Sequence, residues 1–120
     1  MLFRSTALEI ASPFHWDDTR FWSHYELAKL FLEKYRFNDA QVHIEHCKSR
    51  AVNDAYILGR AMEFQAQIWY RQGRLEEAKS ESSHAAEVFE KLGATRELGW
   101  CREFLQDLQK EMSDFVASHE

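Results

Sequence analysis

The sequence predicts an all-α protein of about six helices, packed as successive helical hairpins. Residues 57–93 contain two segments with apolar residues at helical spacing, separated by Gly73. The small and apolar residues of this stretch recur, at a constant offset, nearer the start of the chain. The 120 residues include only 4 glycines and 1 proline, a composition that disfavours all-β and disordered chains.

The stretch 57–93 shows how the hairpins should pack. Its first helix carries two apolar lines, one through Met62, Ala66 and Trp69 and one through Ala61, Phe64 and Ile68. Apolar residues on more than one side predict that this helix contacts more than one neighbour. The second helix has a single apolar face opposite a charged one, and Gly93 ends it. The pair therefore needs further helices beside it.

An offset of 38 residues relates the two halves of the chain. The paired positions are Ala28 with Ala66, Phe31 with Trp69, Ala40 with Ala78, and Cys47 with Ala85. The segment YRFNDA at 35–40 aligns with GRLEEA at 73–78. Self-similarity at such a period indicates stacked hairpins, because no single hairpin buries its apolar face alone.

At these residues the chain resembles the tetratricopeptide repeat (TPR) family. The motif of that family has a small residue within the first helix, an aromatic residue three later, Gly at the turn and small residues along the second helix. The first copy departs at Tyr35, where Gly is usual, so we expect its turn to close without glycine and to be slightly longer. More narrowly, AVNDAYILGRAMEFQAQIWYRQGRLEEAKSE and HAAEVFEKLGA look like repeat regions of fungal NACHT or NB-ARC-type proteins.

The resemblance covers roughly residues 2–112 and implies a short right-handed α-solenoid. We expect a TPR-like domain over 1–112, divided as follows: 2–12 a helix left over from an incomplete repeat, 18–50 the first repeat, 55–92 the second, and 96–112 a capping helix. Asn53 or Asp54 is the expected N-cap of the helix that begins at about 55. Residues 113–120 should form a frayed tail.

Composition and charge indicate a cytoplasmic protein. The net charge of −5 has both signs interspersed, which argues against a nucleic-acid partner. Cys47 and Cys101 occupy core-like helical positions, as reduced buried cysteines do. The sequence has no apolar run long enough to span a bilayer, and its first residues lack the apolar region of a signal peptide, so no membrane association is expected.

Catalytic and cofactor motifs are absent from the sequence, including the P-loop, dinucleotide-binding, zinc-protease and nucleophile-elbow patterns. The best metal candidate is His43, His46 and Cys47, which lie on one side of a helix at i, i+3 and i+4. The simpler alternative, which we favour, is that Cys47 packs inward with the histidines beside it. We therefore expect no enzyme, no metal and no cofactor.

The resemblance implies a concave groove, lined by the first helix of each repeat, that holds a peptide or a partner helix. The expected groove residues are Trp22, Tyr25, Lys29, Arg60, Glu63, Gln67 and Tyr70. Of these, Tyr25, Lys29, Arg60 and Gln67 are taken as exposed and tolerant of substitution. A non-catalytic protein-interaction scaffold is the expected function, and the open ends of the stack allow self-association. Two alternatives remain: a structural terminal module of a larger repeat array in a fungal NACHT-type signalling protein, and a metal-binding or enzymatic protein.

Overall fold

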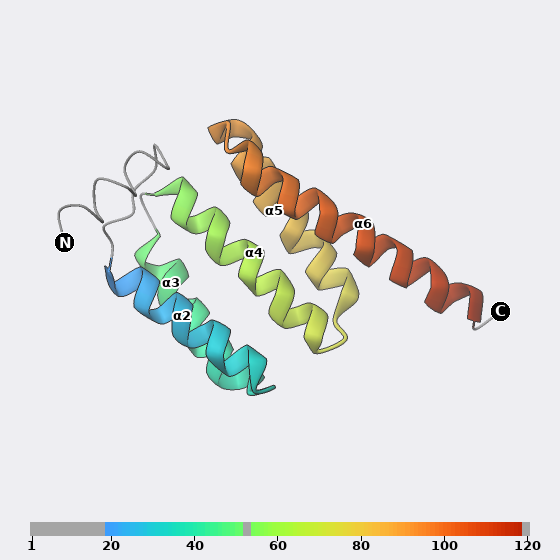
Figure 1. Ribbon diagram of the computed structural model, residues 1–120, viewed down its shortest axis with the longest axis horizontal. Helices are drawn as coiled ribbons and strands as arrows, with labels where there is room; N and C mark the ends of the chain where they lie inside the picture. Colours follow the sequence, from blue (N-terminus) through green and yellow to red (C-terminus); the bar gives the residue numbers. More distant parts are fainter. Residues whose placement is uncertain (1–18, 52–53, 119–120) are drawn as a thin grey trace.

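The computed structural model describes residues 19–51 and 54–118, and this part of the chain forms five α-helices (Figure 1). They are α2 (Thr19–Glu33), α3 (Phe37–Arg50), α4 (Ala55–Arg71), α5 (Leu75–Leu92) and α6 (Thr95–Ser118). Each helix packs against the next, and α2 also contacts α4. The all-α class is confirmed. The helix expected over 2–12 lies outside the described residues.

Two successive hairpins, α2–α3 and α4–α5, turn in the same way. The residue at each turn is left-handed, with φ of 59° at Tyr35 and 79° at Gly73. In both turns the next backbone N–H donates across the turn at 2.8 Å, Arg36 to the carbonyl of Phe31 and Arg74 to that of Trp69. The first turn does close without glycine, but the expectation that it is longer is wrong. Tyr35 adopts the left-handed conformation itself, with its side chain largely exposed.

An arginine after each turn repeats the same contacts. Each one stacks on the aromatic ring five residues before it and pairs with the acid three residues after it. The contacts are Arg36 over Phe31 (4.9 Å) and with Asp39 (2.7 Å), and Arg74 over Trp69 (5.3 Å) and with Glu77. Residues 38 positions apart therefore form equivalent contacts in the two hairpins, in addition to being similar in type.

Small residues let the paired helices approach closely. The predicted repeat positions Ala28, Ala40, Cys47, Ala66, Ala78 and Ala85 are all fully or almost fully buried. Helix α4 lies between the two ends of the domain and contributes to two core clusters, one shared with α2 and α3 and one with α5 and α6. The prediction that this helix packs on more than one side is confirmed.

The expected end of the last helix is wrong. Helix α6 does not stop at residue 112 but continues to Ser118, so residues 113–118 of the expected frayed tail are helical and 119–120 lie outside the described part. These six residues contain neither glycine nor proline, so nothing in them interrupts the helix. The apolar face that predicted the helix ends at Met112, and the backbone extends beyond it.

Gly59 of α4 lies against the ring of Phe89 of α5, and substituting it should be costly. A Cβ atom built there would lie 2.7 Å from Cε1 of Phe89, whose ring is fully buried. We expect Gly59→Ala to lower the free energy of unfolding by about 1–3 kcal/mol, because the ring must shift within a packed core. Gly99 in α6 has no neighbouring atom within 4 Å of the same position. Gly99→Ala should therefore raise the stability by about 0.5–1 kcal/mol. Urea denaturation measures the free energy of unfolding of both variants. A Gly59→Ala variant more stable than the wild type would show that α4 and α5 lie further apart than in this structure.

Candidate binding site between α4 and α6

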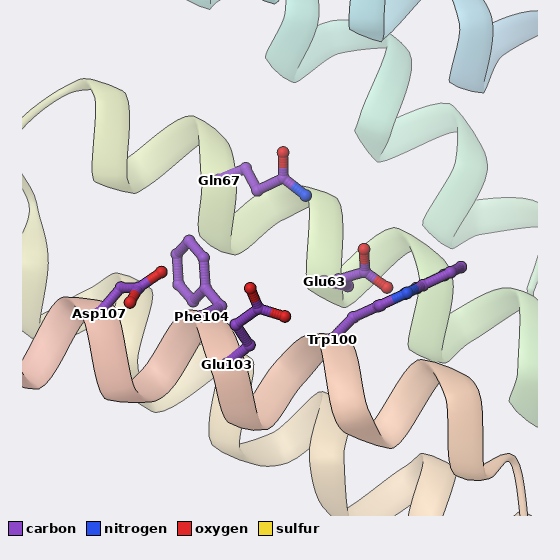
Figure 2. A pocket seen from close by; sticks show the side chains of 6 residues that line it. All are labelled: Glu63, Gln67, Trp100, Glu103, Phe104 and Asp107. Atoms are coloured by element: carbon purple, nitrogen blue, oxygen red, sulfur yellow. The ribbon is translucent and has the colours of Figure 1, made fainter.

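A pocket of about 440 Å³ lies between α4 and α6. Figure 2 shows the side chains of both helices that line it. Helix α4 provides Glu63 and Gln67, and helix α6 provides Trp100, Glu103, Phe104 and Asp107. The spacings i, i+4 on one helix and i, i+3, i+4, i+7 on the other place each set on a single helical face. The pocket therefore has aromatic walls and three carboxyl groups.

Contacts at two levels hold α4 and α6 apart and in register. At one level the rings of Tyr70 and Phe104 meet edge to face at 5.8 Å, and the Tyr70 hydroxyl donates a 2.7 Å hydrogen bond to Glu111. At the other level the guanidinium of Arg60 lies 5.3 Å from the ring of Trp100. The pocket lies between these two contacts. Helix α5 packs against both α4 and α6.

The Arg60 guanidinium lies within a box of four aromatic rings. Its distances to the ring centroids are 5.2 Å for Trp22 and Tyr25 of α2, 5.9 Å for Tyr56 of α4 and 5.3 Å for Trp100 of α6. It donates hydrogen bonds to the hydroxyls of Tyr56 (3.0 Å) and Tyr25 (3.3 Å). The side chain is only 12 % exposed, so these contacts are shielded from water. One residue thereby connects α2, α4 and α6.

Glu63 lines the pocket and also lies beside Arg60, at the edge of the aromatic box. Its Oε2 lies 4.0 Å from Nε of Arg60, and neither atom has a hydrogen-bond partner within the described part of the chain. Burial raises the pKa of Glu63 to about 7, although the nearby charge of Arg60 lowers it and that of Glu97 raises it. The carboxyl group is therefore poised to change charge near neutral pH.

A second carboxylate, Glu97, anchors the start of α6. It accepts a 2.7 Å hydrogen bond from the Tyr56 hydroxyl and one of 3.2 Å from Arg96, and it is 4 % exposed. Burial opposes its ionisation, but these hydrogen bonds outweigh burial and lower its pKa. The carboxylate is thus held ionised, and the Tyr56 hydroxyl links it to Arg60.

Four of the predicted groove residues gather at or beside this pocket. Glu63 and Gln67 line it, Tyr70 borders it through Phe104, and Arg60 lies next to Glu63. The expectation that Arg60 is exposed is wrong. Its guanidinium fills the aromatic box instead of facing solvent, because it has hydroxyl and ring partners on three helices.

The three predicted groove residues of α2 do not line the pocket. Tyr25 is only 6 % exposed, which overturns the expectation that it faces solvent, because its ring packs on Phe64 of α4 at 5.3 Å. Trp22 is half-buried beside it, with the ring centroids 5.5 Å apart. Lys29 is exposed and lies 3.9 Å from Glu26 on the same helix.

The pocket residues of α6 were not predicted. The sequence predicts a one-sided helix whose apolar line is Cys101, Phe104, Leu105, Leu108 and Met112. In the structure Cys101 and Leu108 are buried and the other three are partly buried. Trp100 does not belong to that line, and it is 38 % exposed. A large aromatic residue beside the apolar face, four residues before Phe104, was the signal available in the sequence.

The metal hypothesis finds no support in the arrangement of its residues. His43 and His46 lie near His24, with 2.9 Å between the Nδ1 atoms of His24 and His43 and 4.7 Å between the rings of His24 and His46. The Cys47 thiol is buried and donates to the Phe21 carbonyl oxygen at 3.6 Å. Over residues 19–51 and 54–118, no three His, Cys, Asp or Glu side chains are placed to hold a metal ion.

None of the helices described here has the length and apolar character needed to cross a membrane.

The chain matches no protein-family model, and neither the curated proteins nor the solved structures contain a match to it. The function must therefore be argued from the geometry of the pocket.

Proposed function

We propose that this protein is a non-catalytic interaction module that binds a peptide or a partner helix in the α4–α6 pocket. The observation that carries the proposal is the pocket itself, about 440 Å³ in volume and lined by aromatic and polar side chains of two helices, half of them exposed. Pockets of roughly 300–1,000 Å³ suit small ligands and side chains that project from a partner. Aromatic residues such as Trp100 are also enriched where proteins meet.

The surroundings of the pocket favour binding because they are already ordered. The aromatic box around Arg60 fixes one end, and the contact of Tyr70 with Phe104 fixes the other. Side chains that are held in place before a partner arrives lose less conformational entropy on binding. The side chains at both ends of the pocket are therefore held in place before a partner binds.

We also propose that the helices form a TPR-type right-handed α-solenoid. The matching turns and arginine contacts of the two hairpins support this arrangement. In such a stack α4 and α6 are the first helices of consecutive repeats. The pocket between them then lies in the concave groove that the resemblance implies.

A bulky residue at position 67 tests the proposal. A phage-displayed random peptide library is selected against the wild-type protein, and the affinity of enriched peptides is then measured for Gln67→Trp. Because the indole fills the pocket, we expect the Kd to rise at least about tenfold. The matched control is Val42→Trp, which adds the same side chain on the exposed surface of α3 and should leave the Kd unchanged. Both variants are first shown to melt as the wild type does.

Peptides that bind Gln67→Trp and the wild type equally well would place the binding surface elsewhere. A selection that enriches no peptide would favour the alternative of a structural terminal module, whose role is to close a larger repeat array.

A further inference from the structure

We propose that the α4–α6 pocket selects its partner through a lysine or arginine side chain, which lies against Phe104 between the carboxylates of Glu103 and Asp107. This inference rests on the proposed function and adds the chemistry of the partner. The pocket contains three carboxyl groups, from Glu63, Glu103 and Asp107, and none of the described residues that line it is basic. A partner with complementary charge is therefore cationic.

Glu103 and Asp107 provide the acceptors. They are exposed, lie one helical turn apart on α6, and flank Phe104 in Figure 2. Neither forms an ion pair with any other residue that the structure describes. Two like charges at i and i+4 repel each other, so a cation placed between them relieves that repulsion.

Phe104 provides the apolar contact that a long basic side chain needs. The methylene groups of lysine or arginine pack on apolar surface while the charged end reaches polar atoms. An aromatic ring also attracts a cation through the negative charge of its face. The combination of one ring and two carboxylates therefore recognises both parts of a basic side chain.

Two arginines beside the Trp100 end of the pocket, Arg60 and Arg96, are engaged elsewhere. Arg60 is enclosed by the aromatic box and donates to Tyr56 and Tyr25. Arg96 lies over the ring of Trp100 at 5.3 Å and donates to Glu97. Both guanidinium groups lie near the ring of Trp100, at one end of the pocket. Neither of these two arginines pairs with Glu103 or Asp107 at the Phe104 end.

The inference is tested with two small probes that differ only at the end of the side chain. N-acetyl-lysine N-methylamide carries the cation, and N-acetyl-norleucine N-methylamide lacks it. Each probe is titrated into the ¹⁵N-labelled protein at low salt, and backbone amide shifts are followed by NMR. We expect the lysine probe to shift the amides of residues 103–107 with saturation, and the norleucine probe to bind at least about tenfold more weakly.

Two double variants separate the pocket from the overall charge of the protein. Glu103→Gln with Asp107→Asn removes the two proposed acceptors and should weaken the lysine probe at least about tenfold. Glu87→Gln with Glu90→Gln makes the same change in net charge on the exposed face of α5 and should leave binding intact.

Each alternative outcome has a distinct meaning. Equal binding of the lysine and norleucine probes would overturn selection by charge and leave the proposed peptide-binding function standing. If both double variants weakened binding of the lysine probe equally, the probe would be attracted by the net charge of the whole protein and not by the pocket. That result would also overturn the inference. If neither probe shifts residues 103–107, the inference fails, and the Gln67→Trp comparison with selected peptides decides separately whether the pocket binds a partner.

Discussion

Replacing Tyr25 with alanine is expected to lower the free energy of unfolding by about 3–5 kcal/mol, as deletion of a buried aromatic side chain does. Tyr25 is 6 % exposed and packs on Phe64 of α4 at 5.3 Å and on Phe21 at 5.7 Å. Its removal leaves a cavity between α2 and α4 and opens one side of the box around Arg60. Urea denaturation measures the effect as a lower midpoint with an unchanged slope.

Two further substitutions identify the source of that loss. Tyr25→Phe keeps the ring and removes the hydroxyl to which Arg60 donates at 3.3 Å, so we expect a cost of about 1 kcal/mol. Lys29→Ala changes an exposed side chain on the same helix and should stay within about 0.5 kcal/mol of the wild type. If Tyr25→Ala proved as mild as Lys29→Ala, Tyr25 would lie at the surface and α2 would be rotated about its axis.

Glu63→Gln should stabilise the protein at pH 8 and leave its stability nearly unchanged at pH 4.5. The pKa of Glu63 is raised from 4.5 to about 7 in the folded state, chiefly by burial. The folded protein therefore holds this proton more tightly than the unfolded chain does. Its stability falls as the pH rises from about 4.5 to about 7, by roughly 3 kcal/mol in total, since each pH unit over that range is worth about 1.4 kcal/mol.

Glutamine cannot ionise, so the variant should lack this pH dependence. The charged groups that act on Glu63 are Arg60, which favours the carboxylate, and Glu97, which opposes it. The thiol of Cys101 stays neutral because burial, together with the charge of Glu63, raises its pKa to about 12. Denaturation curves at pH 4.5, 6 and 8 measure the effect, and Glu103→Gln in the same pocket is the matched control. A loss of stability at pH 8 in Glu63→Gln would mean that attraction to Arg60 outweighs burial.

Much of the fold was predictable from local sequence signals. Asp54 was an expected N-cap, and its carboxylate accepts from the backbone N–H groups of Tyr56 (3.1 Å) and Ile57 (3.2 Å). Gly73 and Gly93 were expected to end helices, and both adopt left-handed backbone conformations there. These features depend on the chemistry of a few adjacent residues, so the sequence alone indicates them.

The orientation of α2 was not predictable in the same way. The helix has apolar or aromatic residues on several sides, and the sequence does not indicate which side meets α4. In the structure Tyr25 is buried, whereas Leu27 and Leu30 are 40 % and 44 % exposed. The choice depends on partners such as Phe64, which is distant in sequence and reaches Tyr25 only after the hairpins stack.

The pocket could not be predicted from the sequence, because it also depends on tertiary packing. Its walls come from helices separated by α5, and its depth depends on how far the Tyr70–Phe104 contact holds α4 from α6. No spacing within either helix encodes that separation. Glu63 and Gln67 were predicted site residues because the family resemblance implies that they line a groove, whereas Trp100 and Phe104 joined the site only through tertiary packing.

Binding of a basic side chain in the α4–α6 pocket is tested most directly by intermolecular nuclear Overhauser effects between the bound lysine probe and the aromatic protons of the protein. We expect effects between the δ and ε methylene protons of the probe and the ring protons of Phe104, because the proposed site holds the side chain against that ring with its ammonium group between Glu103 and Asp107. Effects to the rings of Tyr35 or Trp69 instead, with none to Phe104, would contradict it, because those residues lie outside the pocket.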